Sequence, residues 1–289
     1  MTFGELLQWA ISQCKEARVE SVDCERLFCD LLHYPNLRGH DRSQLLTEAQ
    51  VELIRNSVIR RLKGEPVAYI CGETHFYELD LVVDHRVLIP RPETEELVDR
   101  VVQEMRAQAK AVREHNQWTV IDLCCGSGAV GLALAHTFPN LTAHLTDLSP
   151  DALEVAKTNA RRCGLIERCT FRLGDFLQAC EGVQADWIIC NPPYISEEEW
   201  RTLSPEVRDW EPKLALVGEE NGLAFYRRLA EEGWRFLRPG GKLAVECGWQ
   251  QAEEVARLFE RFPWRAGRIV SDLSGHQRFY FVESESHIV

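Results

Sequence analysis

The regular alternation of strand-like and helix-like segments that begins at Trp118 constrains the fold of this chain most strongly. Short apolar runs rich in β-branched residues alternate there with segments whose apolar residues recur at helical spacing. The expected strands cover residues 119–123, 141–146, 170–173, 187–190, 242–247, 268–270 and 278–282, and the expected helices cover 129–136, 150–163 and 250–259. Such alternation builds a mostly parallel sheet with helices on both faces. The sequence therefore predicts an α/β doubly wound domain.

The N-terminal part of the chain has a different pattern. Apolar residues recur at helical spacing from Phe3 to about Lys63, with breaks near Ser21 and at 35–39. This pattern predicts a small helical domain over residues 1–66.

A strand-rich connector is expected over residues 67–90, ahead of the α/β domain at 91–289. Its extended runs are Tyr69–Ile70, Phe76–Leu79, 81–83 and 87–89, which together predict a β-hairpin. Pro92 then stands where it can open a helix that runs through Val102.

Composition narrows the class of protein. The 45% hydrophobic and 27% charged fractions are those of a soluble globular protein. No apolar run approaches the roughly 20 residues of a membrane span, and the first ten residues lack a signal-peptide pattern, so a cytoplasmic protein without membrane contact is expected. The 11 cysteines include no Cys-x-x-Cys pair, so neither a disulfide framework nor a metal site is expected.

The net charge of -12 bears on the partners. It argues against direct binding to nucleic acid, which normally requires a basic face. It is consistent with solubility alone or with a partner that presents a basic surface. Nothing in the sequence calls for a dimer, so a monomer is expected.

A glycine-rich loop follows the first expected strand of the α/β domain. Gly126, Gly128 and Gly131 have the G-x-G-x-x-G spacing of a nucleotide-binding loop. Asp147, near the end of the second strand, stands where a carboxylate would accept hydrogen bonds from ribose hydroxyls. The loop alone is compatible with either a nicotinamide cofactor or S-adenosyl-L-methionine.

Two further features favour S-adenosyl-L-methionine. Asp122 precedes the glycines, where a negative charge suits a cationic sulfonium better than a pyrophosphate. The second feature is the corner Asn191-Pro192-Pro193-Tyr194, which follows the strand-like run 185–190. Its prolines donate no N–H and restrict the backbone, so carbonyls and the Asn191 oxygen can project as acceptors beside the Tyr194 ring. Such a corner grips an –NH2 group, which a dehydrogenase does not need.

Other polar residues allow two interpretations each. Asp175 could bind an adenine amino group with Phe176 against the ring, or be a solvated loop acid beside a core aromatic. Glu93 and Glu95 could stabilise the first turn of their helix or touch a substrate. Arg91 is expected to clamp a nearby carboxylate.

These motifs resemble, in order and over nearly the whole chain, those of the peptide chain release factor glutamine-N5 methyltransferases. The stretch Pro90–Glu95 is the most restrictive of them, because adenine-N6 methyltransferases share the Asn-Pro-Pro-Tyr corner. The other matching segments are 64–70, the glycine loop, Asn191–Tyr194, Glu211-Pro212, Ala215-Leu216 and 246–251.

The resemblance implies a Rossmann-like class I methyltransferase joined by a β-hairpin to an N-terminal helical substrate-recognition domain. The implied reaction transfers a methyl group from S-adenosyl-L-methionine to the glutamine of a Gly-Gly-Gln loop in release factors. By position, the implied cofactor contacts are Cys124, Cys125, Gly126, Ser127, Gly128, Asp147, Phe176 and Asn191, and the implied glutamine contacts are Asn191, Pro192, Pro193 and Tyr194. Phe176 stands where some relatives have tryptophan, and Cys124-Cys125 replaces smaller or polar residues.

The expected catalytic residues are Asn191, Pro192 and Tyr194. An amide nitrogen is a poor nucleophile, so both its hydrogens must be held to direct its lone pair at the methyl group. The Asn191 side-chain oxygen and the Pro192 carbonyl are the expected acceptors, with Tyr194 packed on the amide plane. No dedicated base is expected.

Three alternatives remain open at this point. The chain could methylate a ribosomal protein glutamine, or the N6 amine of adenine in DNA or RNA. It could also be a non-catalytic helical adaptor with a vestigial cofactor fold, although Gly126, Gly128, Asp147 and Asn191 are all present. The acidic run Glu197–Glu199 could contribute to docking or be a solvated surface.

Overall fold

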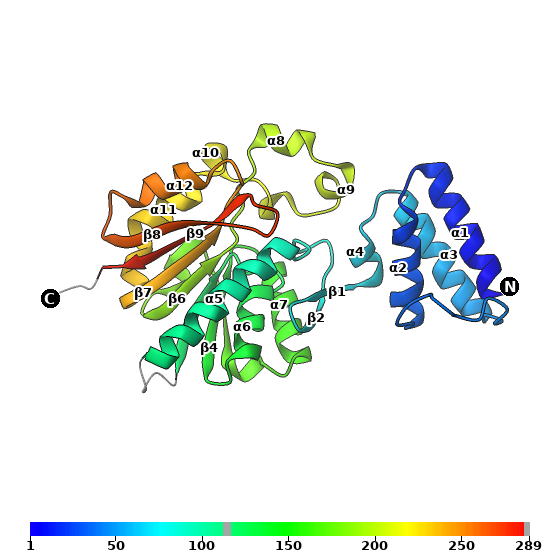
Figure 1. Cartoon of the computed structure of the whole chain (residues 1–289), viewed down its shortest axis with the longest axis horizontal. Helices are drawn as coiled ribbons and strands as arrows, with labels where there is room; N and C mark the ends of the chain where they lie inside the picture. The colour runs from blue at the N-terminus through cyan, green and yellow to red at the C-terminus, as the bar shows by residue number, and fades with distance from the viewer. Residues whose placement is uncertain (112–116, 286–289) are drawn as a thin grey trace. The chain divides into compact units, whose positions relative to one another are not determined.

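A computed structural model describes residues 1–111 and 117–285 of the chain (Figure 1). The chain forms two compact units. One consists of Met1–Glu73 together with Ser204–Trp210, and the other of Thr74–Leu203 with Glu211–Val289. A short segment from far along the chain therefore folds with the N-terminal helices.

The N-terminal unit is helical, as the sequence predicts. Its elements are α1 (Phe3–Ala17), α2 (Ser21–Leu32), α3 (Glu48–Leu62), α4 (Val67–Cys71) and the short α9 (Pro205–Arg208). Thr2 and Thr47 begin α1 and α3 with capping boxes, in which each side chain accepts a backbone N–H. Apolar faces of the helices meet in a core that includes Phe3, Leu27 and Ile54.

An ion-pair cluster holds the distant segment in this unit. Arg61 of α3 binds Asp23 of α2 at 2.7 Å and Glu206 of α9 at 2.7 Å. No local pattern predicts this link, because Arg61 and Glu206 are far apart along the chain.

The connector differs in detail from its prediction. Tyr69 and Ile70 lie in helix α4, and the hairpin consists of β1 (Glu73–Phe76) and β2 (Leu79–Val82). The predicted extended run Phe76–Leu79 contains the hairpin turn, in which Tyr77 has a φ of 57°. Residues 87–89, also predicted as extended, form no strand.

The larger unit contains a seven-stranded sheet. Its strands are β3 (Trp118–Leu123), β4 (Leu141–Asp147), β5 (Cys169–Leu173), β6 (Ala185–Cys190), β7 (Leu237–Glu246), β8 (Trp264–Ser271) and β9 (Gln277–Ser284). The order is β5-β4-β3-β6-β7-β9-β8, and only the pairings of β9 with β7 and β8 are antiparallel. The prediction of a mostly parallel, doubly wound sheet is confirmed.

Helices cover both faces of this sheet (Figure 1). One face packs against α5 (Pro92–Ala111), α6 (Ala129–Thr137) and α7 (Pro150–Arg162), and the other against α11 (Ala224–Glu232) and α12 (Ala252–Phe259). Successive strand residues alternate between the two cores: Val120 faces the first, and Ile121 the second. The sequence did not predict α11.

Short helical segments occupy several connections in this unit. They are η1 (Ile166–Arg168), η2 (Phe176–Cys180), α8 (Glu197–Thr202), η3 (Lys213–Ala215), α10 (Glu219–Gly222) and η4 (Gly233–Phe236). No helix of the described residues is long and apolar enough to cross a membrane.

Candidate functional site

The order of the strands locates the site. The chain runs outward from β3 to β4 and β5, and then returns to place β6 on the other side of β3. Open α/β sheets bind ligands at such a switch point, beyond the carboxyl ends of the strands. The glycine loop follows β3, Asp147 ends β4, and Asn191 follows β6, so three predicted site segments meet there.

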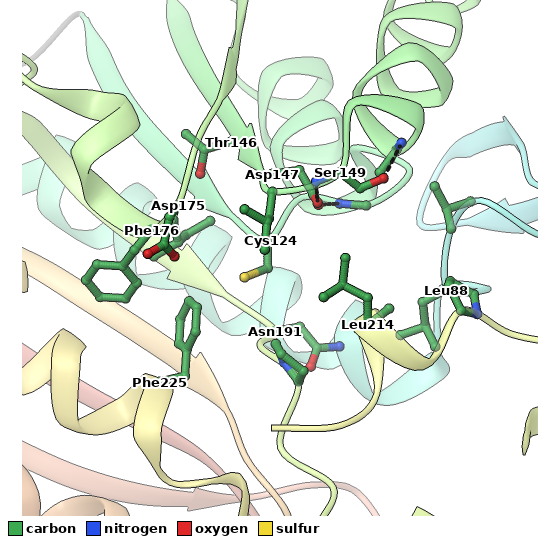
Figure 2. Close-up of a pocket in the computed structure, with 18 of the residues that line it drawn as sticks. Leu88, Cys124, Thr146, Asp147, Ser149, Asp175, Phe176, Asn191, Leu214 and Phe225 are labelled. Atoms are coloured by element: carbon green, nitrogen blue, oxygen red, sulfur yellow. Dashed lines mark hydrogen bonds between the residues drawn. The ribbon is translucent and has the colours of Figure 1, made fainter. Parts of the chain in front are cut away.

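A cavity opens at this switch point and contains about 910 Å³ of empty space, its open mouth included. Figure 2 shows side chains from several segments around it. The lining residues are Arg86, Val87, Leu88, Leu123, Cys124, Gly126, Thr146, Asp147, Leu148, Ser149, Ala152, Gly174, Asp175, Phe176, Asn191, Pro193, Pro212, Leu214, Ala215 and Phe225.

The glycine loop needs residues that tolerate left-handed backbone. Cys124, Gly126 and Gly128 have φ values of 60°, 52° and 82°. A Cβ on Gly126 would have no atom within 4 Å, whereas a Cβ on Gly128 would lie 3.0 Å from Leu145. Gly126 thus lines the cavity, while Gly128 allows the loop to pack closely on the sheet.

Asp147 ties the loop to the next helix. Its Oδ2 accepts from the Gly126 N–H at 2.9 Å and its Oδ1 from the Ser149 N–H at 2.9 Å (Figure 2). Burial raises the pKa of this carboxyl, although both backbone bonds oppose the shift. Asp147 also lines the cavity, so it can orient the loop and accept from a ligand hydroxyl.

Asp122 has a different role from the one that the sequence suggested. It is buried, does not line the cavity, and accepts from the Gly131 N–H at the start of α6 at 2.8 Å. Burial raises the pKa of Asp122 to about 7. Asp122 is a cap for α6, so the expectation that its charge faces the cofactor was wrong.

An aromatic pair forms the end of the cavity near η2. The rings of Phe176 and Phe225 meet edge to face with their centroids 5.0 Å apart. Arg228 lies over the Phe176 ring at 4.3 Å and binds both oxygens of Asp175, at 3.0 and 3.1 Å. Asp175 therefore lines the cavity but is already paired. Thr146 also lines the cavity, and no described residue hydrogen-bonds to its buried hydroxyl.

Hydrogen bonds from distant segments hold the Asn-Pro-Pro-Tyr corner. The Asn191 Nδ2 donates to Thr94 Oγ1 at 3.0 Å, and the Thr94 hydroxyl donates to Glu246 Oε2 at 2.7 Å. The Tyr194 hydroxyl donates to Glu246 Oε1 at 3.1 Å. Within the described residues no donor reaches Asn191 Oδ1 or the Pro192 carbonyl oxygen.

A glycine-rich segment and one glutamine support the corner from behind. A Cβ on Gly218 would lie 2.3 Å from the Pro193 carbonyl oxygen, and one on Gly222 would lie 1.9 Å from that of Tyr194. The Gln251 Nε2 donates to the carbonyls of Tyr194 and Asn221, both at 3.0 Å. This close backbone packing fixes the position of the corner.

The residues before α5 form a second support. Glu211 forms an ion pair with Arg91 and accepts from the Ile89 N–H at 3.1 Å. Arg91 is thus the clamp that the sequence predicted. Glu95 accepts from the Tyr77 N–H at 2.7 Å and so holds the hairpin turn.

The structure brings most of the predicted site residues to one cavity. Those that line it are Cys124, Gly126, Asp147, Phe176, Asn191 and Pro193, while Cys125, Ser127, Gly128, Pro192 and Tyr194 are neighbours of these in the same loop and corner but are not among the lining residues. No group of His, Cys, Asp or Glu in the described residues is arranged to hold a metal ion.

Sequence reasoning assigned no role to several residues that shape the site. Thr94 and Glu246 lie within segments that carried the resemblance, but their contact joins positions 152 residues apart. Phe225 lies in the unpredicted helix α11. For Gly222, the sequence Glu-Glu-Asn-Gly was a turn signal that could have been noticed.

The fold and the site define the class of protein as a methyltransferase. Residues 100–204 match the family model "Methyltransferase small domain". A methyltransferase from Pyrococcus furiosus is similar in structure, with a TM-score of 0.51 and 17% identity over 80% of this chain and 98% of that one. The N-terminal domain of human METTL16 has a TM-score of 0.51 at 14% identity, covering 91% of this chain and 94% of that one.

Relatives in sequence identify the family. The release factor glutamine methyltransferase of Bacillus cereus is 37% identical over 99% of this chain and 100% of its own length. That of Caulobacter vibrioides is 40% identical over 81% of this chain and 78% of its own length. Residues 5–72 match the family model "PrmC N-terminal domain". The chain belongs to the release factor glutamine methyltransferase family.

Proposed function

We propose that this protein uses S-adenosyl-L-methionine to methylate the side-chain amide nitrogen of the glutamine in the Gly-Gly-Gln loop of peptide chain release factors. The observation that carries the proposal is the Asn191 amide, whose Nδ2 is bound by Thr94 while its Oδ1 accepts from no described residue. A free oxygen beside the cavity suits a carboxamide N–H. Relatives named for the same activity over their full length support the substrate.

The cavity fits the cofactor. Space at Gly126 leaves room for a ligand against its backbone, and Thr146, a residue of the cavity wall, has a buried hydroxyl that no described residue satisfies. We assign Asp147 to the ribose hydroxyls, Phe176 to the adenine ring, and the loop Cys124–Gly128 and Asn191 to the rest of the cofactor. When bound, S-adenosyl-L-methionine supplies an electrophilic methyl group on a sulfonium.

The corner residues would orient the substrate amide. Asn191 Oδ1 and the Pro192 carbonyl each accept one amide hydrogen, which turns the nitrogen lone pair out of conjugation with its own carbonyl. Tyr194 and Pro193 restrict the amide plane and exclude water. Such fixed alignment lowers the barrier chiefly through proximity and orientation.

The same acceptors stabilise developing charge. The nitrogen becomes positive as it gains its fourth bond, so its hydrogens bind Asn191 Oδ1 and the Pro192 carbonyl more tightly than before. Glu246 is the buried carboxylate that the corner contacts, but Thr94 and Tyr194 already occupy its two oxygens. The methylated amide nitrogen is strongly acidic, so its proton is lost to water after the product has left the corner, and no residue need act as a base.

The protein substrate and the surface it meets are also part of the proposal. The N-terminal helical unit recognises the release factor, and the enzyme works as a cytoplasmic monomer without direct contact with nucleic acid. Of the acidic run 197–199, Glu197 is paired with Lys213 and Glu199 caps its own helix α8. Glu198 is the member of the run with no ion pair or capping bond among the described residues, so the docking hypothesis is tested at this residue. If Glu198→Lys left the KM for a release factor unchanged at low salt, the docking role would be wrong.

A side-by-side methyl-transfer assay tests the function. Labelled S-adenosyl-L-methionine is supplied with a purified release factor, the same factor with Gly-Gly-Ala in its loop, ribosomal proteins, and DNA or RNA. The proposal expects label in the intact release factor and none in the Gly-Gly-Ala variant. Label in ribosomal protein or nucleic acid instead would replace the proposal by one of the two rival substrates.

A further inference from the structure

A buried hydrogen-bond chain runs from the catalytic corner to the end of the central sheet. Its members are Asn191 after β6, Thr94 in the first turn of α5, and Glu246 at the end of β7. Glu246 is 1% exposed and Thr94 4% exposed. The backbone carbonyl of Glu246 also accepts from the Tyr226 hydroxyl at 2.8 Å. All of these residues lie in the larger unit.

The number of hydrogen atoms available determines in which direction the hydrogen bonds between Asn191, Thr94 and Glu246 are donated. A threonine hydroxyl has one hydrogen and accepts through its lone pairs. An ionised Glu246 has no hydrogen to give, so the Thr94 hydrogen must point to Glu246 Oε2. Thr94 Oγ1 can then only accept from Asn191, which directs Nδ2 toward Thr94 and leaves Oδ1 for other partners.

We propose that Thr94 and Glu246 are positioning residues which fix the Asn191 side-chain amide with its oxygen toward the substrate. The inference rests on the proposed function, because it concerns how the glutamine amide is held. Asn191 reversed by half a turn would present an NH2 group to the NH2 of the substrate. Two donor groups repel each other, so an enzyme with the Asn191 amide reversed would not align the substrate nitrogen.

The same carboxylate also holds Tyr194, the last residue of the corner. The Tyr194 hydroxyl donates to Glu246 Oε1, so one buried group orients both Asn191, through Thr94, and Tyr194 directly. Breaking one partner of such a network leaves the others unsatisfied in a low-dielectric interior. The polar network therefore places the corner more accurately than packing alone.

Protonation of Glu246 would reverse the direction of donation along these hydrogen bonds. A protonated Oε2 donates to Thr94, whose own hydrogen then turns to Asn191 and favours the reversed amide. The ionisable groups facing Glu246 are Glu93 of α5, Tyr194, Tyr226 of α11, Cys247 and Arg278 of β9. Arg278 is itself bound to Asp272 at 3.0 Å. Burial raises the pKa of Glu246 to about 7, so the reversal should begin near neutral pH.

Substitution of Thr94 gives the first test. Thr94→Val keeps the shape of the side chain and removes the hydroxyl, whereas Thr94→Ser keeps the hydroxyl. We expect Thr94→Val to lower kcat for release factor methylation by at least about 30-fold, with KM for both substrates changed by less than about threefold, and Thr94→Ser to retain kcat within about threefold. Equal kcat values for the valine and serine variants, high or low, would overturn the proposal.

The pH profile of Glu246→Gln gives the second test, which does not depend on the folding of the valine variant. The wild-type kcat should fall about tenfold per pH unit on the acid side of neutrality, as the ionised fraction of Glu246 falls. Glutamine is isosteric and does not titrate, so the variant should have a lower kcat without this fall. A variant with the wild-type acid fall would overturn the proposal. Absence of methylation by the wild-type enzyme would instead refute the proposed function, so the two failures are distinguishable.

Discussion

The close packing of Gly222 against the catalytic corner allows a test in which a single methyl group is added. In Gly222→Ala the new Cβ would lie 1.9 Å from the Tyr194 carbonyl oxygen, whereas ordinary contact begins at about 3.4 Å. The difference, 3.4 minus 1.9, is about 1.5 Å, and the neighbour is backbone, which cannot rotate away. The corner must therefore shift by roughly that distance.

The expected effect is on turnover. A misplacement of about 1 Å at a reacting group can reduce the rate by about 100-fold. We therefore expect Gly222→Ala to lower kcat at least about 100-fold. Binding of S-adenosyl-L-methionine, measured by isothermal titration, should change less than about tenfold, because the glycine loop and Asp147 are not displaced.

A matched control separates this clash from the cost of the left-handed backbone. Gly222 has a φ of 83°, and Gly164, which follows α7, has a φ of 69° with no atom within 4 Å of the position that a Cβ would take. Gly164→Ala should lose about 1–2 kcal/mol of stability from its conformation alone and keep its kcat within about twofold. If the two variants had kcat values within about threefold of each other, the idea that Gly222 sets the position of the corner would be refuted.

Three further substitutions test separate parts of the site. Asn191→Ala should lower kcat at least about 100-fold while cofactor affinity, by titration, stays within about tenfold, or about 1.4 kcal/mol; near-normal turnover would contradict the mechanism. Asp147→Ala should weaken cofactor binding at least about tenfold, because it removes a ligand acceptor and frees the Gly126 N–H; unchanged affinity would remove Asp147 from the cofactor site. For Asp122 the folded-state pKa of about 7 exceeds the ordinary 3.8, so the native state binds more protons than the unfolded state between these values. The contribution of this group to the free energy of unfolding is therefore fully present below pH 3.8 and is lost as the pH rises toward 7. Asp122→Asn removes this pH dependence. The free energy of unfolding of the variant, relative to that of the wild type, should therefore increase by up to about 4 kcal/mol between about pH 4 and pH 8. A difference between the two urea midpoints that stays constant over this range would show that Asp122 does not titrate there.

The sheet and its helices could be predicted because their signals are local and periodic. Each strand predicted from residue 119 onward is present, since burial on one or both faces gives a strand an apolar run that the sequence displays. The connector was harder to predict. Tyr69 and Ile70 are β-prone residues in a helical turn, and the turn at Tyr77 depends on a hydrogen bond to Glu95, which is 18 residues away.

The residues of the site likewise fall into those that could be predicted from local sequence and those that could not. Segments that act as contiguous motifs, such as the glycine loop and Asn191–Tyr194, could be recognised from residue order alone. The partners that orient them could not, because Thr94, Glu246 and Gln251 reach the corner only through tertiary packing. Asp122 was misread for a related reason. Its position before the glycines is visible in the sequence, but the direction of its side chain, toward α6, is not.

Catalysis, as proposed, depends on Asn191 Oδ1 and the Pro192 carbonyl holding the substrate amide together. A crystal structure of the enzyme with S-adenosylhomocysteine and a Gly-Gly-Gln peptide measures this directly. We expect the glutamine Nε2 to lie about 3 Å from both oxygens, with the Asn191 Nδ2 still bound to Thr94. A corner directed away from the sulfur, or an Asn191 that presents its NH2 group to the glutamine, would show that the amide is held in some other way.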